Sequence, residues 1–198
     1  MDKSGRGSEG DERRRRAPRK ATETSLTNAA LFYLQRFASS SENLRRMLLR
    51  RVARSARHHG TDPAEGAALV DAIVARFEQN GLLDDQTYAE ARARSLHRRG
   101  ASTRMIRAGL RQKGVADDAI DRALAALAED TEDPELAAAV ALARRRRLGP
   151  HRPAAQRESH RERDLATLAR AGFSYDIARR VIEAETVADL DAMLSGEE

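Results

Sequence analysis

The chain has 198 residues, enough for one or two ordinary domains; 34% of them are charged, and the formal net charge is +5. The absence of cysteine excludes disulfides and thiolate metal sites, and no apolar run approaches the ~20 residues that a membrane span needs. The charged N-terminus lacks the apolar stretch of a secretory signal, so we expect a cytoplasmic protein without membrane contact. The basic excess points to an anionic partner.

The apolar residues predict a thin core. Only 4% of the chain is aromatic, tryptophan is absent, and alanine and leucine dominate the apolar set. Such small side chains suit stacked helical modules, each burying one face against its neighbour, better than one thick core.

Both ends of the chain are predicted to be tails. Residues 1–24 are rich in glycine, serine and charge and have almost nothing to bury, which predicts a disordered basic tail. Its run from Arg13 to Arg16 either touches a polyanion without specificity or only aids solubility. We expect residues 186–198 to form an acidic C-terminal tail.

From Leu26 onward the pattern is helical, and no segment alternates apolar and polar residues as a strand would. Asp62-Pro63 supplies an N-cap aspartate and a proline at the first helical position, and Asp133-Pro134 repeats this arrangement. Further candidate caps are Ser39 (in a capping box with Glu42), Asp84, Asp117 and Ser174. Helices are therefore predicted at 26–38, 41–57, 63–79, 85–98, 102–113, 117–129, 134–147, 159–171 and 175–185.

Nine helices divide into three groups of three, at residues 25–83, 84–132 and 133–185. A turn with a basic residue, a glycine and an apolar residue follows the second helix of two groups, as Gln112-Lys113-Gly114-Val115 and Arg170-Ala171-Gly172-Phe173. A glycine in the left-handed conformation ends a helix in this way while the apolar residue packs back. We predict an all-α fold of three tandem three-helix repeats; chance similarity among Ala/Leu/Arg-rich helices is the competing explanation.

Arginines form stripes on two of the predicted helices. In the first stripe the arginines share one helix face and the leucines another; its members are Arg46, Arg50, Arg54 and Arg57. Of these, only Arg46 has an acidic residue within reach, Glu42. Uncompensated like charges cost helix stability, which a bound anion would recover.

The second stripe comprises Arg104, Arg107 and Arg111, and the helix before it carries Arg94, Arg98 and Arg99. Glu90 lies four residues before Arg94, so part of this basic surface can pair internally. Two parallel stripes favour binding to a polyanion or an acidic groove over a merely solvated surface.

A third basic cluster closes the helix at 134–147, with Arg144, Arg145, Arg146 and Arg147 in its last turn. The helix dipole favours cations there, which accounts for one or two of the four. The following loop, 149–157, is expected to be mobile and serves either as an accessory contact or as a linker.

No catalytic, metal or cofactor signature is present. The five histidines are scattered without an HExxH arrangement, and no GxxxxGK[ST] loop occurs. Asp84-Asp85 is explained more simply by helix capping than by metal binding, and aromatic residues are too sparse for base stacking. We expect no enzymatic activity and no cofactor.

The motifs together resemble the RecX family of recombinase modulators. The resemblance rests on Gly81-Leu82-Leu83-Asp84-Asp85, Tyr88-Ala89, Arg98-Arg99-Gly100, Ile106, Leu110 and Arg111-Gln112-Lys113-Gly114-Val115. Gly172-Phe173-Ser174-Tyr175 is similar to the family's closing segment, and Ala30-Leu31-Tyr33-Leu34 to its opening. The resemblance covers residues 26–185, and its middle third is the most specific part.

This resemblance implies an elongated, curved array of three-helix repeats that binds along the groove of the RecA–DNA filament. Family members commonly inhibit the ATPase, strand-exchange and coprotease activities of RecA, in DNA repair and the SOS response, and have no active site. The implied contacts in the matching motifs are Arg98, Arg99, Arg107, Arg111 and Lys113. The first repeat departs from the pattern because it lacks the compact turn, and the third because it carries an Arg/His-rich stretch at 144–163.

We expect a monomer whose partners are RecA and, through salt-sensitive non-specific contacts, single- and double-stranded DNA. Two other classes of function stay open. One is a direct DNA-binding protein such as a transcription regulator with a helix-turn-helix around Gly100, although the stripes extend over several helices. The other is a helical-repeat scaffold for protein partners.

Overall fold

The computed structural model describes residues 18–195, which form ten α-helices and one short 3₁₀ helix, with no strand in that range. The helices are α1 (Glu23–Leu34), α2 (Ser41–His59), α3 (Pro63–Gln79), α4 (Asp85–Arg98), α5 (Thr103–Gln112), α6 (Asp117–Glu129), α7 (Pro134–Arg146), η1 (Gly149–His151), α8 (Ala154–Arg170), α9 (Tyr175–Glu183) and α10 (Val187–Ser195). The predicted all-α fold is confirmed. The basic run at 13–16 and the last three residues lie outside the described range.

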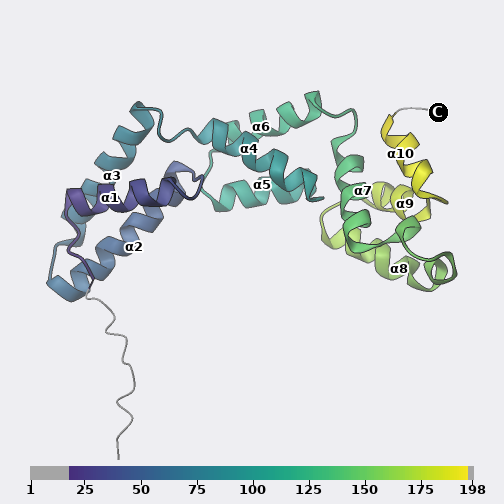
Figure 1. The fold of residues 1–198 in the computed structure, drawn as a ribbon, viewed down its shortest axis with the longest axis horizontal. Coiled ribbons are helices and arrows are strands. Elements are labelled where there is room, and N and C mark those ends of the chain that lie inside the picture. The colour runs from purple at the N-terminus through teal and green to yellow at the C-terminus, as the bar shows by residue number, and fades with distance from the viewer. Residues whose placement is uncertain (1–17, 196–198) are drawn as a thin grey trace, which may run out of the picture.

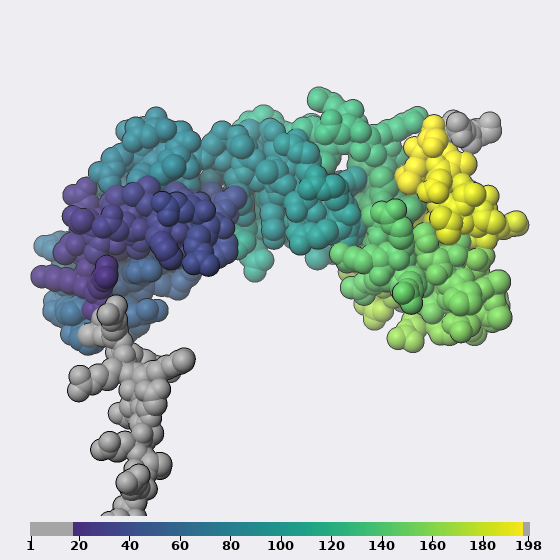
Figure 2. Space-filling model, viewed as in Figure 1, coloured from purple at the N-terminus to yellow at the C-terminus, as the bar shows by residue number. Residues whose placement is uncertain are grey.

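The helices follow one another along an elongated arch, as the family resemblance implied (Figure 1). α1–α3 form one end, α4–α6 the middle and α7–α10 the other end. Figure 2 shows the same arch in space-filling form, hollowed along its lower edge. Three separate clusters of buried residues lie in these groups, centred on Leu48, Ile106 and Leu168.

Local capping signals set most helix boundaries. The bounds of α3, α4 and α6 are those expected from the sequence. Four of the expected N-cap side chains accept a hydrogen bond from a backbone N–H of the first turn: Asp62, Asp84, Asp133 and Ser174. These bonds satisfy backbone amides that the helix itself leaves unpaired. Because only a few residue types can do this, the helix starts could be predicted from the sequence.

The start of α1 and the caps of α2 and α6 differ from the prediction. α1 begins at Glu23, within the segment predicted to be a tail, because Thr22 and Ser25 form a capping box. The cap of α2 is Ser40 and not Ser39. Asp117 is already helical, and Ala116 precedes α6 without a side-chain cap.

The prediction of a mobile loop at 149–157 is wrong, because this segment contains η1 and the first turn of α8. The carboxylate of Asp164, only 2% exposed, accepts hydrogen bonds from the backbone N–H of Gly149 at 3.1 Å and from Arg152 at 3.0 Å. Because a buried carboxylate is stable only when it is paired, this contact holds the segment to α8.

The prediction of an acidic tail at 186–198 is also wrong for residues 187–195, because these residues form α10. Its apolar residues Val187, Leu190 and Leu194 recur at helical spacing, and Leu190 is fully buried against the core that includes α7. The abundance of acidic residues hid this amphipathic pattern.

Two joints of the same construction connect the three groups. At the first, the hydroxyl of Ser40, the N-cap of α2, donates to the carbonyl of Lys113. The next amide, the N–H of Ser41, donates to Oδ1 of Asp85 at 2.7 Å. Each of these bonds joins the first group to the second.

The second joint repeats both hydrogen bonds. The hydroxyl of Ser102, the N-cap of α5, donates to the carbonyl of Ala171 at 2.7 Å. The N–H of Thr103 donates to Oε1 of Glu135 at 2.7 Å. Both cap serines are fully buried, so the bonds lie inside the joints.

The glycine of the recurring turn is required at both joints. Gly114 and Gly172 have φ of +77° and +93°, a conformation that side chains rarely adopt. A Cβ on Gly172 would stand 2.6 Å from the Ser102 hydroxyl, and one on Gly114 would meet the Glu42 side chain. By contrast, a Cβ on Gly60 of the first group would meet nothing within 4 Å. The turn recurs because the neighbouring group packs directly against it.

We predict that Ser102→Ala and Ser40→Ala each lower the free energy of unfolding by about 2–4 kcal/mol. Each loses a helix cap, worth ~1 kcal/mol, and also leaves a carbonyl in the joint unpaired, at ~1–3 kcal/mol. Ser174→Ala is the matched control, because the exposed Ser174 caps α9 without bridging groups. Urea unfolding of the three variants measures this, and equal losses in all three would show that the joints add nothing.

Candidate nucleic-acid interface

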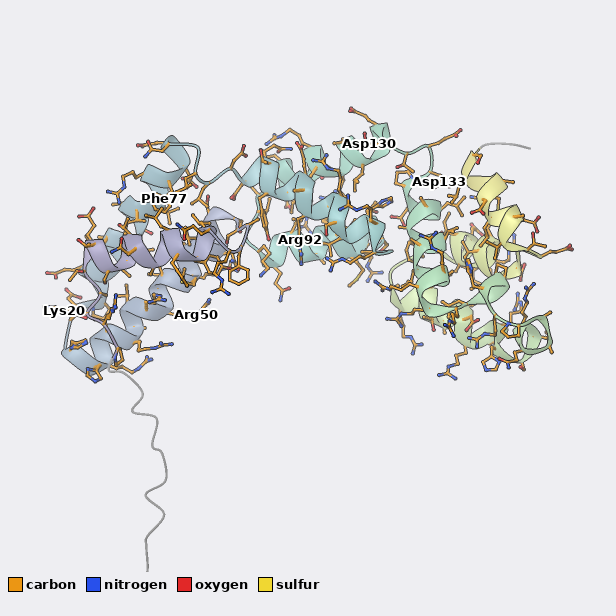
Figure 3. All side chains as sticks on the ribbon, in the orientation of Figure 1. Lys20, Arg50, Phe77, Arg92, Asp130 and Asp133 are labelled. Carbon is orange, nitrogen blue, oxygen red and sulfur yellow. The ribbon has the colours of Figure 1, made fainter. Side chains whose placement is uncertain are left out.

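The middle helices of the three groups, α2, α5 and α8, lie along the concave lower edge of the arch (Figure 1). Figure 3 places Arg50 of α2 on this side and Asp130 on the opposite, convex side. The curvature therefore brings helices far apart in sequence onto one surface.

The stripe on α2 is largely free of acidic partners, as the sequence indicated. Arg50, Arg54 and Arg57 are exposed and form no ion pair within residues 18–195. Arg46 is engaged: its guanidinium pairs with Glu42 at 2.8 Å and donates to the carbonyl of Gln112 at 2.9 Å. Arg46 thus belongs to the first joint, and the next three arginines present the free charge.

The stripe on α5 is partly neutralised by the following helix. Arg107 pairs with Asp121, and Arg111 pairs with Asp117 at 2.6 Å. The hydrogen bond from Arg111 lowers the pKa of Asp117, so this carboxylate is ionised at neutral pH. Arg104 is exposed and forms no ion pair in the described part of the chain. Of this stripe, only Arg104 is immediately available to a partner.

The remaining arginines of the second group divide in the same way. Arg94 pairs with Glu90 at 3.6 Å, as its spacing predicted. Lys113 lies at the first joint, where its amine donates to Asn43 at 3.3 Å. Arg98 and Arg99 are exposed, and Arg99 donates only to the backbone carbonyl of Ser95.

The third group presents the densest free positive charge. Its four consecutive arginines at the end of α7 are exposed and have no ion pair in the described range: Arg144, Arg145, Arg146 and Arg147. Sequence analysis missed two exposed arginines of α8, Arg163 and Arg170, which lie seven residues and two helical turns apart. Arg170 could have been predicted as a candidate, because it is the basic residue that begins the recurring glycine turn.

The N-termini of α2 and α5 are occupied by carboxylates of the neighbouring group. Asp85 accepts from the first amide of α2, and Glu135 from that of α5. A helix-turn-helix presents the N-terminal residues of its recognition helix to base edges. Here that end of α5 lies in a joint, beside Gly100, whose added Cβ would stand 2.6 Å from the Leu142 nitrogen.

The rest of the described chain adds two observations. Within residues 18–195, no helix is both long and apolar enough to cross a membrane. The same range contains no group of three or more histidine, aspartate or glutamate side chains placed to hold a metal ion.

Comparison with known proteins identifies the family. The family model described as RecX, second three-helix domain, matches residues 84–124, which cover most of the middle group. The regulatory protein RecX of Myxococcus xanthus is 46% identical over 173 residues, covering 87% of this chain and 91% of that protein. This chain belongs to the RecX family. The RecX protein of Agrobacterium fabrum is 34% identical over 168 residues, covering 85% of this chain and 86% of that protein.

Solved RecX structures share the fold. The crystal structure of RecX from Lactobacillus salivarius superposes with a TM-score of 0.56 at 23% identity, covering 85% of this chain and 96% of that one. A second RecX crystal structure gives a TM-score of 0.54 at 22% identity, covering 82% of this chain and 72% of the other. The three-group helical array is therefore a RecX architecture.

We predict that the double variant Asp117→Asn, Asp121→Asn binds DNA roughly two- to tenfold more tightly than the unmodified protein at 50 mM salt. Removing both carboxylates frees Arg107 and Arg111 for phosphates without adding a basic residue. Fluorescence polarisation with a labelled oligonucleotide measures the change.

The matched control is Glu129→Gln, Asp130→Asn, which alters the net charge equally at the end of α6. Figure 3 places Asp130 on the convex side, away from the middle helices. If both double variants gain the same affinity, the effect is one of net charge, and freeing these two arginines has no role.

Proposed function

We propose that this RecX-family protein modulates the RecA recombinase by binding along the groove of the RecA–DNA filament. The observation that carries the proposal is a set of exposed arginines on middle helices that share the concave side, none of which forms an ion pair within residues 18–195: Arg50, Arg54 and Arg57 of α2, Arg104 of α5, and Arg170 of α8. A curved array whose middle helices carry free arginines fits a helical groove that contains DNA. The relatives' name, regulatory protein RecX, supports the same function.

In this proposal the protein is a non-enzymatic, cytoplasmic monomer that restrains the ATPase, strand-exchange and coprotease activities of RecA in DNA repair and the SOS response. Binding across several subunits of a filament would oppose their rearrangement, because one rigid body would contact them together. A sequence-specific transcription regulator is less well supported, since the N-terminus of α5 is held by Glu135 within a joint.

The DNA contribution predicts a steep dependence on salt. Neutralising roughly 6–10 phosphates would weaken binding by about 10³–10⁵ between 50 and 200 mM salt, because condensed counterions are released on association. Titrations of a single-stranded oligonucleotide at several salt concentrations measure the slope. A flat salt profile would remove DNA from the interaction and leave the scaffold alternative.

The direct test is the DNA-stimulated ATPase of RecA, with the purified protein titrated in at fixed single-stranded DNA. We expect a reduced rate at substoichiometric protein, and we expect Arg50→Ala, Arg54→Ala to shift the titration to at least about threefold higher protein because these cations contact phosphate. The control Arg122→Ala, Arg179→Ala removes the same charge from α6 and α9, outside the middle helices, and is expected to act like the unmodified protein. No effect from several-fold excess of folded protein would overturn the proposed function.

A further inference from the structure

A cavity of about 350 Å³ opens at the joint between the second and third groups. Its apolar lining comes from α5, α7 and the turns beside them and consists of Ala101, Met105 and Leu142. Its charged lining comes from α7 and α8 and consists of Arg145, Arg146 and Arg170. No acidic residue contributes to the lining. The cavity falls in the range of ~300–1,000 Å³ typical of small-ligand pockets.

The close packing of the joint creates this cavity. Gly100 lets the turn before α5 approach the backbone of Leu142, and the Gly172 turn lies against Met105, whose Cγ would be 3.5 Å from an added Cβ. Met105 nevertheless remains 48% exposed, although it lines an apolar surface. An apolar side chain held open in this way offers a contact surface for a flat, uncharged group.

The cations of the cavity have little to bind within the protein. Arg145 and Arg146 are exposed and unpaired over residues 18–195, and the side chain of Arg170 reaches only the Thr167 hydroxyl, at 3.4 Å. A second cavity of about 330 Å³ shares Arg146 and Thr167 with the first and continues to Arg163; its one acidic residue, Asp164, pairs with Arg152. Positive charge therefore extends from the apolar surface along α8, as successive phosphates would require.

The corresponding cavity at the first joint is different. Its volume is about 510 Å³ and its lining includes Leu31, Phe37 and Leu82, but it contains Asp84 and no arginine or lysine. Apolar surface alone therefore does not distinguish the second joint. Its distinguishing feature is the combination of apolar surface with three cations.

We propose that the cavity at the second joint binds an unstacked base of single-stranded DNA, with the flanking phosphates at Arg145, Arg146 and Arg170. Met105 contacts the base, since a thioether makes favourable contacts with aromatic rings and a guanidinium plane can stack on a base. Single strands are favoured because a base in a duplex must first be unpaired and unstacked. This inference deepens the proposed function and rests on it, because it assigns the DNA strand of the filament to one named site.

The experiment uses the full chain without RecA and measures the affinity for two labelled 15-residue oligonucleotides, oligothymidylate and an abasic chain with the same phosphates. We expect the unmodified protein to prefer the thymidylate by about two- to tenfold, the factor that a thioether–ring contact of ordinary strength supplies. Met105→Ala should remove most of this preference and leave the abasic affinity unchanged. Arg170→Ala should weaken binding to both oligonucleotides.

Matched controls are available elsewhere on the surface. Met193→Ala alters another exposed methionine, in α10, and Arg179→Ala another exposed arginine, in α9; both should bind as the unmodified protein does. Thermal melts establish that each variant is folded. The proposal is overturned if Met105→Ala leaves thymidylate binding unchanged, or if it weakens binding to both oligonucleotides equally. It is also overturned if Arg170→Ala weakens binding no more than Arg179→Ala does. Because RecA is absent, these outcomes are independent of the ATPase test.

Discussion

The shape of the molecule depends on a buried serine hydroxyl that starts a helix and also holds the next group. Ser40 and Ser102 each accept a first-turn amide and donate to a carbonyl on the neighbouring turn. Because the residue after that carbonyl is a glycine in a left-handed conformation, the two groups approach without an intervening side chain. Using the same device twice gives both joints similar geometry, and an arch follows from their repetition.

The third group ends the array differently. Its middle helix, α8, follows Pro153 and has no side-chain cap, so it lacks the serine that receives a further group. α10 instead packs on this group and buries Leu190. Helical-repeat arrays need a terminal unit whose outer face is not an open packing surface, and α10 together with the altered start of α8 supplies it.

The distribution of acidic residues decides which arginines can meet a partner. Asp117 and Asp121 of α6 engage the second stripe, whereas Arg50, Arg54 and Arg57 of the first stripe and the arginines at the end of α7 lack acidic partners in the described chain. A surface pair contributes little to stability in water, so in the proposed function these aspartates would restrain affinity for DNA more than they stabilise the fold. If the protein binds the RecA–DNA filament as proposed, such restraint would help it to leave, because strong phosphate binding would extend to any DNA.

The sequence by itself determined the helices up to α9, except for the first turn of α8, and it determined the recurring turn; α10 was not foreseen. A helix cap such as Asp62 and a turn glycine such as Gly114 or Gly172 interact with residues only three or four positions away. The local sequence therefore shows where these helices begin and end. Tertiary structure alone decided the pairing of Arg107 with Asp121, the burial of Asp164 and the cavity at Met105, because each depends on how separate helices pack. The joints combine the two levels: the glycine turns were visible, but their serine partners lie about 70 residues away in sequence, where no local pattern points to them.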